Sequence, residues 1–137
     1  MSSMSKKKYK SSQIYLENIV EHCRKIREYA AGVTYETMEK RDLEFDAIVQ
    51  RLQALGENMV KIENGHDKII QHFQDVIDWS GLKRLRDVIS HNYEGLVERQ
   101  ILDYANNEIN KVESGVLQIL KQRYGIWIKK GHERFGR

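Results

Sequence analysis

Apolar residues recur at spacings of three and four along most of the chain, which is the period of an amphipathic helix. Residues 12–31, 34–63 and 97–123 show this spacing, and a further stretch begins near residue 78 and ends near residue 92. The most regular stripe belongs to the second of these stretches: Phe45, Ile48, Leu52, Leu55, Met59 and Ile62. The pattern therefore predicts four main helices.

Turn signals separate the predicted helices at short intervals. Gly32 and the pair Asn64-Gly65 are suited to end the first two helices, and Thr34 with Thr37 offers N-caps for the second. A short apolar-periodic piece precedes the third main helix, and the chain contains no proline. No segment alternates with a period of two, so no strand is expected. We predict an all-α fold, an antiparallel up-and-down bundle of four main helices plus a short extra helix.

The composition suits one domain that is not embedded in a membrane. The chain has 137 residues, of which 40% are hydrophobic and 31% charged. No apolar run approaches the roughly 20 residues that a membrane span needs, and no secretory signal is visible at the start. We therefore expect a cytoplasmic protein with no membrane partner. The single cysteine, Cys23, lies on the first apolar stripe and is expected to be a buried thiol.

Both ends of the chain are basic, whereas the body between them is acidic, although the formal net charge is only +3. We divide the chain into a basic, disordered N-terminal segment (residues 1–11), a helical domain (12–123) and a basic C-terminal tail (124–137). The tail carries Tyr124, Trp127 and Phe135 among its lysines and arginines. It is suited either to single-stranded RNA or to a protein partner, and the sequence favours neither.

Several kinds of site are not supported by the sequence. There is no glycine-rich phosphate loop of either common pattern, and no H-E-x-x-H pair. The one cysteine has no partner at the spacing of a zinc site. We therefore expect neither a metal ion nor a cofactor.

The stretch RDVISHNY, residues 86–93, concentrates polar chemistry at the end of the third main helix. Five residues separate Arg86 from His91, which places them roughly 140° apart around a helix. One flank then carries Lys83, Arg86 and Ser90, and the next carries Asp87 and His91. Asn92 is well placed to end the helix.

Spacing alone leaves two interpretations of this stretch open. His91 is favoured at a helix C-terminus by the macrodipole, with Asn92 as the stop and Tyr93 packing behind it. Alternatively, the residues are the parts of metal-free phosphodiester cleavage in RNA. An imidazole can take a proton from the ribose 2′-OH or give one to the leaving oxygen, and an arginine can stabilise the phosphorane. A two-fold dimer would double both groups.

The run Arg86-x-x-x-x-His91-x-Tyr93, on a helix before the last long helix, resembles the HEPN superfamily. Its H-x-Y ending is similar in particular to the HepT-like toxins of HEPN/MNT toxin–antitoxin pairs. The segments LQALGENMVKI and WSGLKRLRDVISHNYEGL add to this resemblance, which covers residues 12–120.

The resemblance implies a toxin that is a metal-independent endoribonuclease and acts as a homodimer, with the two motifs meeting across the interface. Arg86 and His91 match the catalytic pair, and Asp87 stands where many relatives have asparagine, from where it could pair with His91. Tyr93 matches the tyrosine to which the MNT nucleotidyltransferase antitoxin transfers AMP from ATP. The RNA contacts expected around the pair are Lys83, Ser90 and Asn92. The alternative function is a non-catalytic helical binding or adaptor module for nucleotides or RNA.

Overall fold

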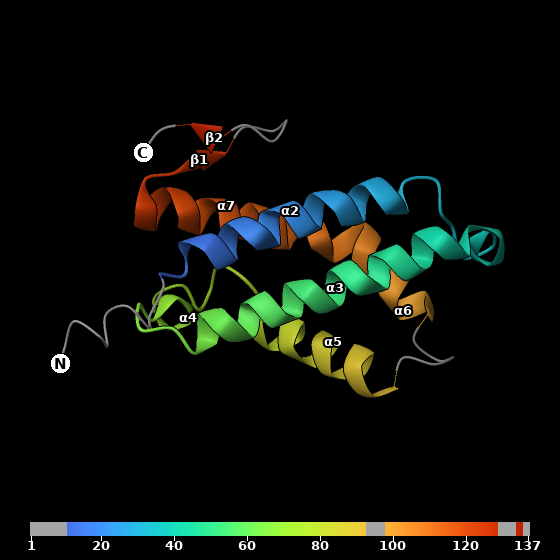
Figure 1. The fold of residues 1–137 in the computed structure, drawn as a ribbon, viewed down its shortest axis with the longest axis horizontal. Helices are drawn as coiled ribbons and strands as arrows, with labels where there is room; N and C mark the ends of the chain where they lie inside the picture. The colour runs from blue at the N-terminus through green and yellow to red at the C-terminus, as the bar shows by residue number, and fades with distance from the viewer. Residues whose placement is uncertain (1–10, 93–97, 129–133, 136–137) are drawn as a thin grey trace.

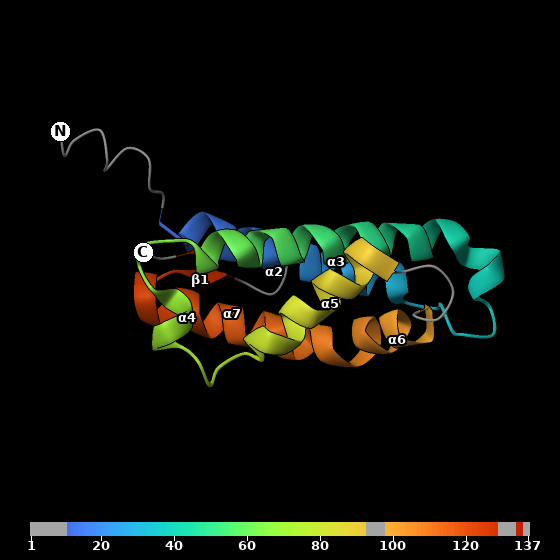
Figure 2. The ribbon, with the colours of Figure 1, turned by 90° about the horizontal axis from the view of Figure 1, so that it is seen from below.

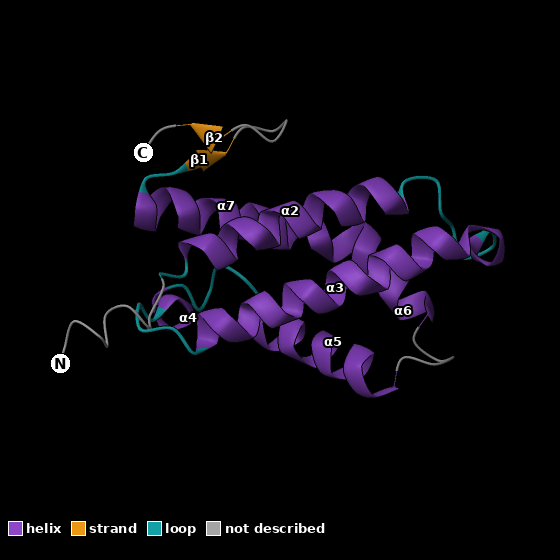
Figure 3. Ribbon diagram, viewed as in Figure 1, coloured by secondary structure: helices purple, strands orange, loops and turns teal. Residues whose placement is uncertain are grey.

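The computed structural model describes residues 11–92, 98–128 and 134–135, and Figure 1 shows their arrangement. Most of the described chain is helical (Figure 3), which confirms the predicted all-α class. The elements, in chain order, are α2 (Gln13–Ala30), the 3₁₀ turn η1 (Met38–Arg41), α3 (Asp42–Glu63), α4 (Ile69–His72), α5 (Trp79–Asn92), α6 (Glu98–Asp103), the π-helical turn η2 (Tyr104–Glu108), α7 (Ile109–Tyr124), β1 (Trp127–Ile128) and β2 (Arg134–Phe135).

The long helices alternate in direction along the chain, as in an up-and-down bundle. The colours of Figure 1 show α2 and α5 running one way and α3 and α7 running the other. Extensive packing joins α2 to α3, α2 to α7, and α3 to α5. No comparable packing joins α5 to α7, and Figure 2 shows α5 inclined between α3 and the α6–α7 side. The bundle is therefore closed around α2 and open between α5 and α7.

The apolar stripes predicted from the sequence form the core. Every stripe position named for α3 is buried, and so is Cys23 on α2. Burial raises the pKa of the Cys23 thiol well above its usual range, so the thiol stays protonated and unreactive. The prediction of a buried core thiol is confirmed. None of the helices in the described ranges is both long enough and apolar enough to cross a membrane.

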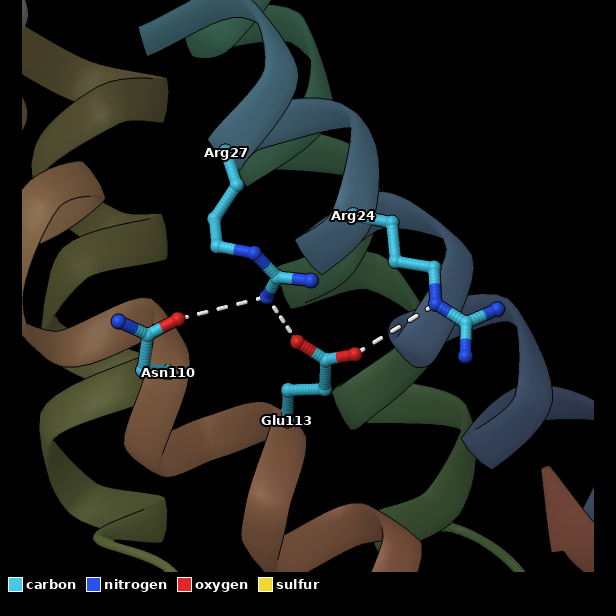
Figure 4. Close-up of polar contacts among 4 residues, drawn as sticks. All are labelled: Arg24, Arg27, Asn110 and Glu113. Carbon is cyan, nitrogen blue, oxygen red and sulfur yellow. Dashed lines mark hydrogen bonds and ion pairs between the residues drawn. The ribbon is translucent and has the colours of Figure 1, made fainter. Parts of the chain in front are cut away.

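A group of charged residues joins α2 to α7 on the closed side of the bundle (Figure 4). Glu113 forms ion pairs with Arg24, at 3.5 Å from Nε, and with Arg27. Arg27 also donates a hydrogen bond to the side chain of Asn110, at 3.4 Å. Glu113 and Arg24 are almost fully enclosed by the two helices. Since an enclosed carboxylate is tolerated only when it is paired, this cluster fixes how α2 and α7 lie against each other.

A second polar contact joins the three chain segments at the end of the bundle near the N-terminus. The backbone N–H and the hydroxyl of Ser12 each donate to the Asp67 carboxylate at 2.7 Å, and the Tyr124 hydroxyl does so at the same distance. Burial acts to raise the pKa of Asp67, but the hydrogen bonds from Ser12 and Tyr124 outweigh it and lower the pKa. Asp67 therefore favours the folded state in its charged form.

The structure corrects one predicted helix boundary and the expectation that the chain has no strand. Thr34 and Thr37 do cap a turn, because each backbone N–H donates to the other residue's hydroxyl, at 3.0 and 3.2 Å. That turn leads into η1, however, and α3 begins only at Asp42. The sequence also predicted no strand, whereas β1 and β2 form a short antiparallel pair, with Trp127 opposite Phe135. The expectation of no strand is thus wrong for this short stretch.

The last predicted helix is one helix with a widened turn in it. The π-helical turn η2 joins α6 to α7, so the segment continues with one turn of wider spacing. Ile101, Ala105 and Ile109 are all buried although they are spaced by two successive steps of four residues. A wider turn accommodates that spacing, since a π-turn holds more residues than the 3.6 of an α-turn.

Candidate functional site

The start of α5 is held in place by local hydrogen bonds. The Asp78 carboxylate accepts a hydrogen bond from the backbone N–H of Gly81 at 3.0 Å, which caps the helix. The indole of Trp79 is buried and donates to the backbone carbonyl of Phe73 at 3.0 Å. Leu82 and Ile89 are buried, and α5 packs against α3. These contacts fix which flanks of α5 face the bundle and which face solvent.

Arg86 lies where α5 crosses α3, and its side chain packs over Gly56. A Cβ atom placed on Gly56 would lie 2.6 Å from Cγ of Arg86 and 2.8 Å from its Cβ, closer than real carbon contacts. The Nε atom of Arg86 is buried and makes no hydrogen bond to any described residue. The stem is therefore clamped between the helices, while the side chain as a whole remains partly exposed. Its guanidinium is thus presented at the surface from a fixed base.

Asp87 pairs with Arg86. One terminal nitrogen of Arg86 donates to Oδ1 of Asp87 at 3.1 Å. The sequence suggested a pair between Asp87 and His91, but no contact between those two side chains is found within the described residues. Asp87 is half exposed, so its charge is largely screened by water. In this structure it orients the arginine rather than the histidine.

The remaining predicted site residues lie around the same helix end. Lys83, Ser90 and His91 are exposed, and the Lys83 ammonium lies 3.7 Å from the Glu63 carboxylate of α3. Asn92 is the last residue of α5, as predicted for a helix stop. Tyr93 lies outside the described residues.

One chain does not bring Arg86 and His91 together. Both belong to the continuous helix α5, five residues apart, and so project from flanks roughly 140° apart. Arg86 faces the α3 side, where Gly56 is, and His91 faces solvent. Among the residues described, no group of three histidine, cysteine, aspartate or glutamate side chains could hold a metal ion. The α5 helix presents the guanidinium of Arg86 and the imidazole of His91 as candidate functional groups.

Gly56 is the site residue that sequence reasoning missed. Glycine in the middle of a helix costs roughly 1 kcal/mol relative to alanine, so an isolated one indicates a packing requirement. Gly56 is such a glycine, inside the most regular apolar stripe of the chain, and it is buried. The sequence shows that something must approach there closely. It does not show that the approaching group is Arg86.

The fold and the site define a class: a small helical bundle that presents an arginine and a histidine from one exposed helix. Residues 19–119 match the family model described as Ribonuclease HepT-like. This match covers most of the bundle, including α5, and the chain belongs to that HEPN-superfamily family.

Named relatives are similar over most of this chain at low identity. "Putative RNase TTE0752" of Caldanaerobacter subterraneus subsp. tengcongensis is 26% identical over 113 residues, which is 82% of this chain and 97% of that protein. "Putative RNase MJ0127" of Methanocaldococcus jannaschii is 27% identical over 110 residues, which is 80% of this chain and 85% of that protein. No solved structure is significantly similar to the chain.

Proposed function

We propose that the protein is a metal-independent endoribonuclease toxin whose site is completed by a homodimer. The observation that carries the proposal is that one helix holds both a clamped Arg86 and an exposed His91. Family membership and the names of the relatives support RNA as the substrate. Lys83, Ser90 and Asn92 flank the pair and would contact the RNA backbone.

The chemistry needs only the groups that α5 carries. An imidazole of His91 takes the proton of a ribose 2′-OH, and that oxygen attacks the neighbouring phosphorus. The bond to the 5′-oxygen breaks, and this oxygen leaves with a proton given by the imidazolium of His91 in one copy or the other. The product is a 2′,3′-cyclic phosphate, and no oxidant or metal takes part. Arg86 stabilises the additional negative charge on the phosphorane. Asp87 keeps the guanidinium in position through their hydrogen bond.

The geometry of one chain supports the proposal of a homodimer. Because Arg86 and His91 leave α5 on different flanks, a single copy is poorly arranged to hold one phosphate between them. A two-fold axis near the end of α5 would place His91 of one copy near Arg86 of its partner, and would create two such pairs. Light scattering of the parent protein tests this step and should give the mass of a dimer. A monomer that cleaves RNA would contradict it.

RNA cleavage in the presence of EDTA tests the activity. The full chain should cut single-stranded RNA under these conditions, and His91→Ala should lose at least 100-fold in rate, since general acid–base groups contribute about that much or more. His72→Ala is the matched control, because His72 is exposed on α4, which lies by the first residue of α5, whereas His91 is near the last. Equal cleavage by His91→Ala and the parent would show that the assignment is wrong.

Regulation by modification forms part of the proposal. An MNT-type nucleotidyltransferase antitoxin would bond the Tyr93 phenolic oxygen to the α-phosphorus of ATP, with pyrophosphate leaving. A bulky anion two residues after His91 would repel RNA phosphate. Intact mass after incubation with that partner and ATP should rise by adenylyl units in the parent but not in Tyr93→Phe. An equal mass increase in Tyr93→Phe would place the modification elsewhere.

One observation favours a non-catalytic alternative. Arg86 is clamped on Gly56 and paired with Asp87, which are contacts that a purely structural arginine also makes. Under that alternative Arg86→Ala lowers the unfolding free energy, and the parent protein has no ribonuclease activity. Under the proposed function the parent cleaves RNA, and Arg86→Ala loses cleavage even at temperatures where it is fully folded.

A further inference from the structure

A groove of about 770 Å³ opens on the side of the bundle where α5 does not pack against α7. Its apolar lining comes from four parts of the chain: Val76 and Ile77 before α5, Leu85 and Val88 of α5, Ile101 of α6, and Val112 of α7. A volume of this size is typical of sites that enclose a small organic group. The groove is therefore a candidate binding site that is separate from the Arg86–Gly56 contact.

Tyr104 gives the groove an aromatic surface. It lies in the π-helical turn η2, is half-buried, and lines the groove. Burial, with a further contribution from Glu108, raises the pKa of its hydroxyl, which therefore stays protonated and able to donate. Widened π-turns are found frequently at functional sites, and this one places Tyr104 in the wall of the groove.

The polar groups at the rim suit the edges of a nucleobase. Asp75, Asp78 and Glu108 line the groove, and their carboxylate oxygens can accept from base amino and ring N–H groups. Asp78 also accepts from the backbone of Gly81, and Glu108 forms an ion pair with Lys111 at 3.5 Å. Arg84 lies on the α5 lip and forms no ion pair with a described residue, so its guanidinium can reach a carbonyl or phosphate oxygen. A flat apolar body with such edges is the shape and chemistry of an unpaired base.

The groove continues toward the proposed reacting group. Arg84 and His91 are seven residues apart in α5, which places them on nearly the same flank and roughly 10 Å apart along the axis. Val88 lies between them on this flank and lines the groove. A nucleotide seated at Arg84 and Val88 would therefore have its neighbouring phosphate directed toward His91.

We infer that the groove between α5 and α6–α7 is a nucleobase subsite, which seats one unpaired base of single-stranded RNA against Tyr104, next to the phosphate that His91 approaches. The inference rests on the proposed function for the meaning of that phosphate. The binding itself can be measured without any cleavage.

Binding of a fluorescent adenosine RNA hexamer to the full-length His91→Ala protein tests the inference by fluorescence anisotropy. Adding Tyr104→Leu removes the stacking face and the hydroxyl but keeps apolar bulk, and should weaken binding at least tenfold. Tyr35→Leu in the same background is the matched control, because Tyr35 is an exposed tyrosine at the α2–α3 connection. It should change the affinity less than twofold. Circular dichroism confirms that each variant is folded.

A second variant keeps the test decisive if Tyr104→Leu fails to fold. Val88→Met lengthens a half-buried side chain at the lip, adds neither charge nor an aromatic face, and should weaken hexamer binding severalfold. Unchanged affinity in every folded groove variant would overturn the inference. The inference would also be overturned if free AMP displaced the hexamer and bound as tightly as the hexamer does, because the groove would then be a mononucleotide site.

The two proposals fail in different ways. If the parent chain cleaves RNA but the groove variants bind the hexamer normally, the subsite is wrong and the ribonuclease stands. If the parent chain does not cleave RNA but Tyr104→Leu weakens hexamer binding, the groove binds RNA and the ribonuclease assignment is wrong.

Discussion

Two arginine–carboxylate pairs on opposite sides of the bundle differ in how far water reaches them. On the closed side, the Arg24 and Glu113 side chains are 7% and 12% exposed, and two helices enclose them (Figure 4). On the open side, those of Arg86 and Asp87 are 29% and 49% exposed. Charge enclosed in this way is tolerated only when paired, whereas a half-exposed pair contributes little to stability. An arginine–carboxylate pair therefore holds two helices together on the closed side, whereas on the open side it leaves the Arg86 guanidinium partly accessible to solvent.

The open side has this character because α5 packs on α3 but not on α7. An α5 helix packed on both neighbours would bury Val88 and occupy the groove. Instead, the described part of α5 has one flank clamped on Gly56 and another facing solvent. Stability is concentrated around α2, and the open flank carries the polar groups proposed to bind and cleave RNA.

Removing the shared carboxylate on the closed side should produce the largest change in stability. Glu113→Ala removes the carboxylate that pairs with both α2 arginines, and should lower the unfolding free energy by about 3 kcal/mol. Urea denaturation followed by circular dichroism measures the change. The matched variant is Asp87→Ala, which should cost less than about 1 kcal/mol. Equal costs would remove the distinction between the two sides.

Gly56→Ala should damage both the fold and the site. The new methyl group would overlap Cγ of Arg86, so α5 or the arginine must shift. Overpacking of this kind typically costs about 1–3 kcal/mol. Displacing the guanidinium should also reduce the RNA cleavage rate about tenfold at temperatures where the variant is fully folded. The rate constant at saturating RNA and the melting temperature measure the two effects separately.

Gly65→Ala provides the control for this substitution. Gly65 lies just beyond the C-terminal end of α3. A Cβ atom added to it would lie 3.2 Å from its nearest neighbours, Oδ1 of Asp67 and Oγ of Ser12. This variant should lose some stability but retain the parent cleavage rate. Unimpaired cleavage by Gly56→Ala would show that Arg86 does not need to be held where it lies.

Asp67 should make the end of the bundle near the N-terminus sensitive to acid. The folded-state pKa of Asp67 is lowered, so its contribution to stability is present above the unfolded pKa of about 4 and is lost as the pH falls through the folded value. Asp67→Asn keeps the shape but loses the charge, and should cost about 1.5 kcal/mol at pH 7, as hydrogen bonds to charged groups do. The cost should shrink below pH 4. A cost independent of pH would contradict the assignment.

The helices and the core could be predicted from sequence because burial is periodic along the chain. Each stripe position of α3 needed only its neighbours three and four residues away to be recognised. The sequence indicates the π-turn more weakly, through two consecutive spacings of four residues between Ile101 and Ile109. This spacing can be interpreted only once the wider turn is known. Local patterns thus contain most of the fold.

The site could be predicted only in part, because its remaining features depend on how helices cross. Arg86 and His91 were recognisable from their spacing and resemblance. The clamp by Gly56 requires α5 to pass over α3 at that residue, which no local pattern specifies. The pairing of Asp87 with Arg86 depends on which side-chain orientation the crossing allows. The groove exists because α5 and α7 stay apart, which is a property of the whole bundle.

Neutralising Asp87 should have the smallest effect on stability and a measurable effect on RNA. Asp87→Asn keeps an acceptor for the Arg86 guanidinium but removes a negative charge from beside it. Because the carboxylate is half exposed, the unfolding free energy should change by less than about 1 kcal/mol. The dissociation constant for RNA, measured in the His91→Ala background, should fall severalfold at low salt, and the gain should fade as salt screens the charge. The same substitution at Asp46, an exposed acid on α3, controls for net charge alone. An equal gain there would show that Asp87 acts only through the overall charge of the protein, whereas a gain confined to Asp87 would place the RNA phosphate next to Arg86.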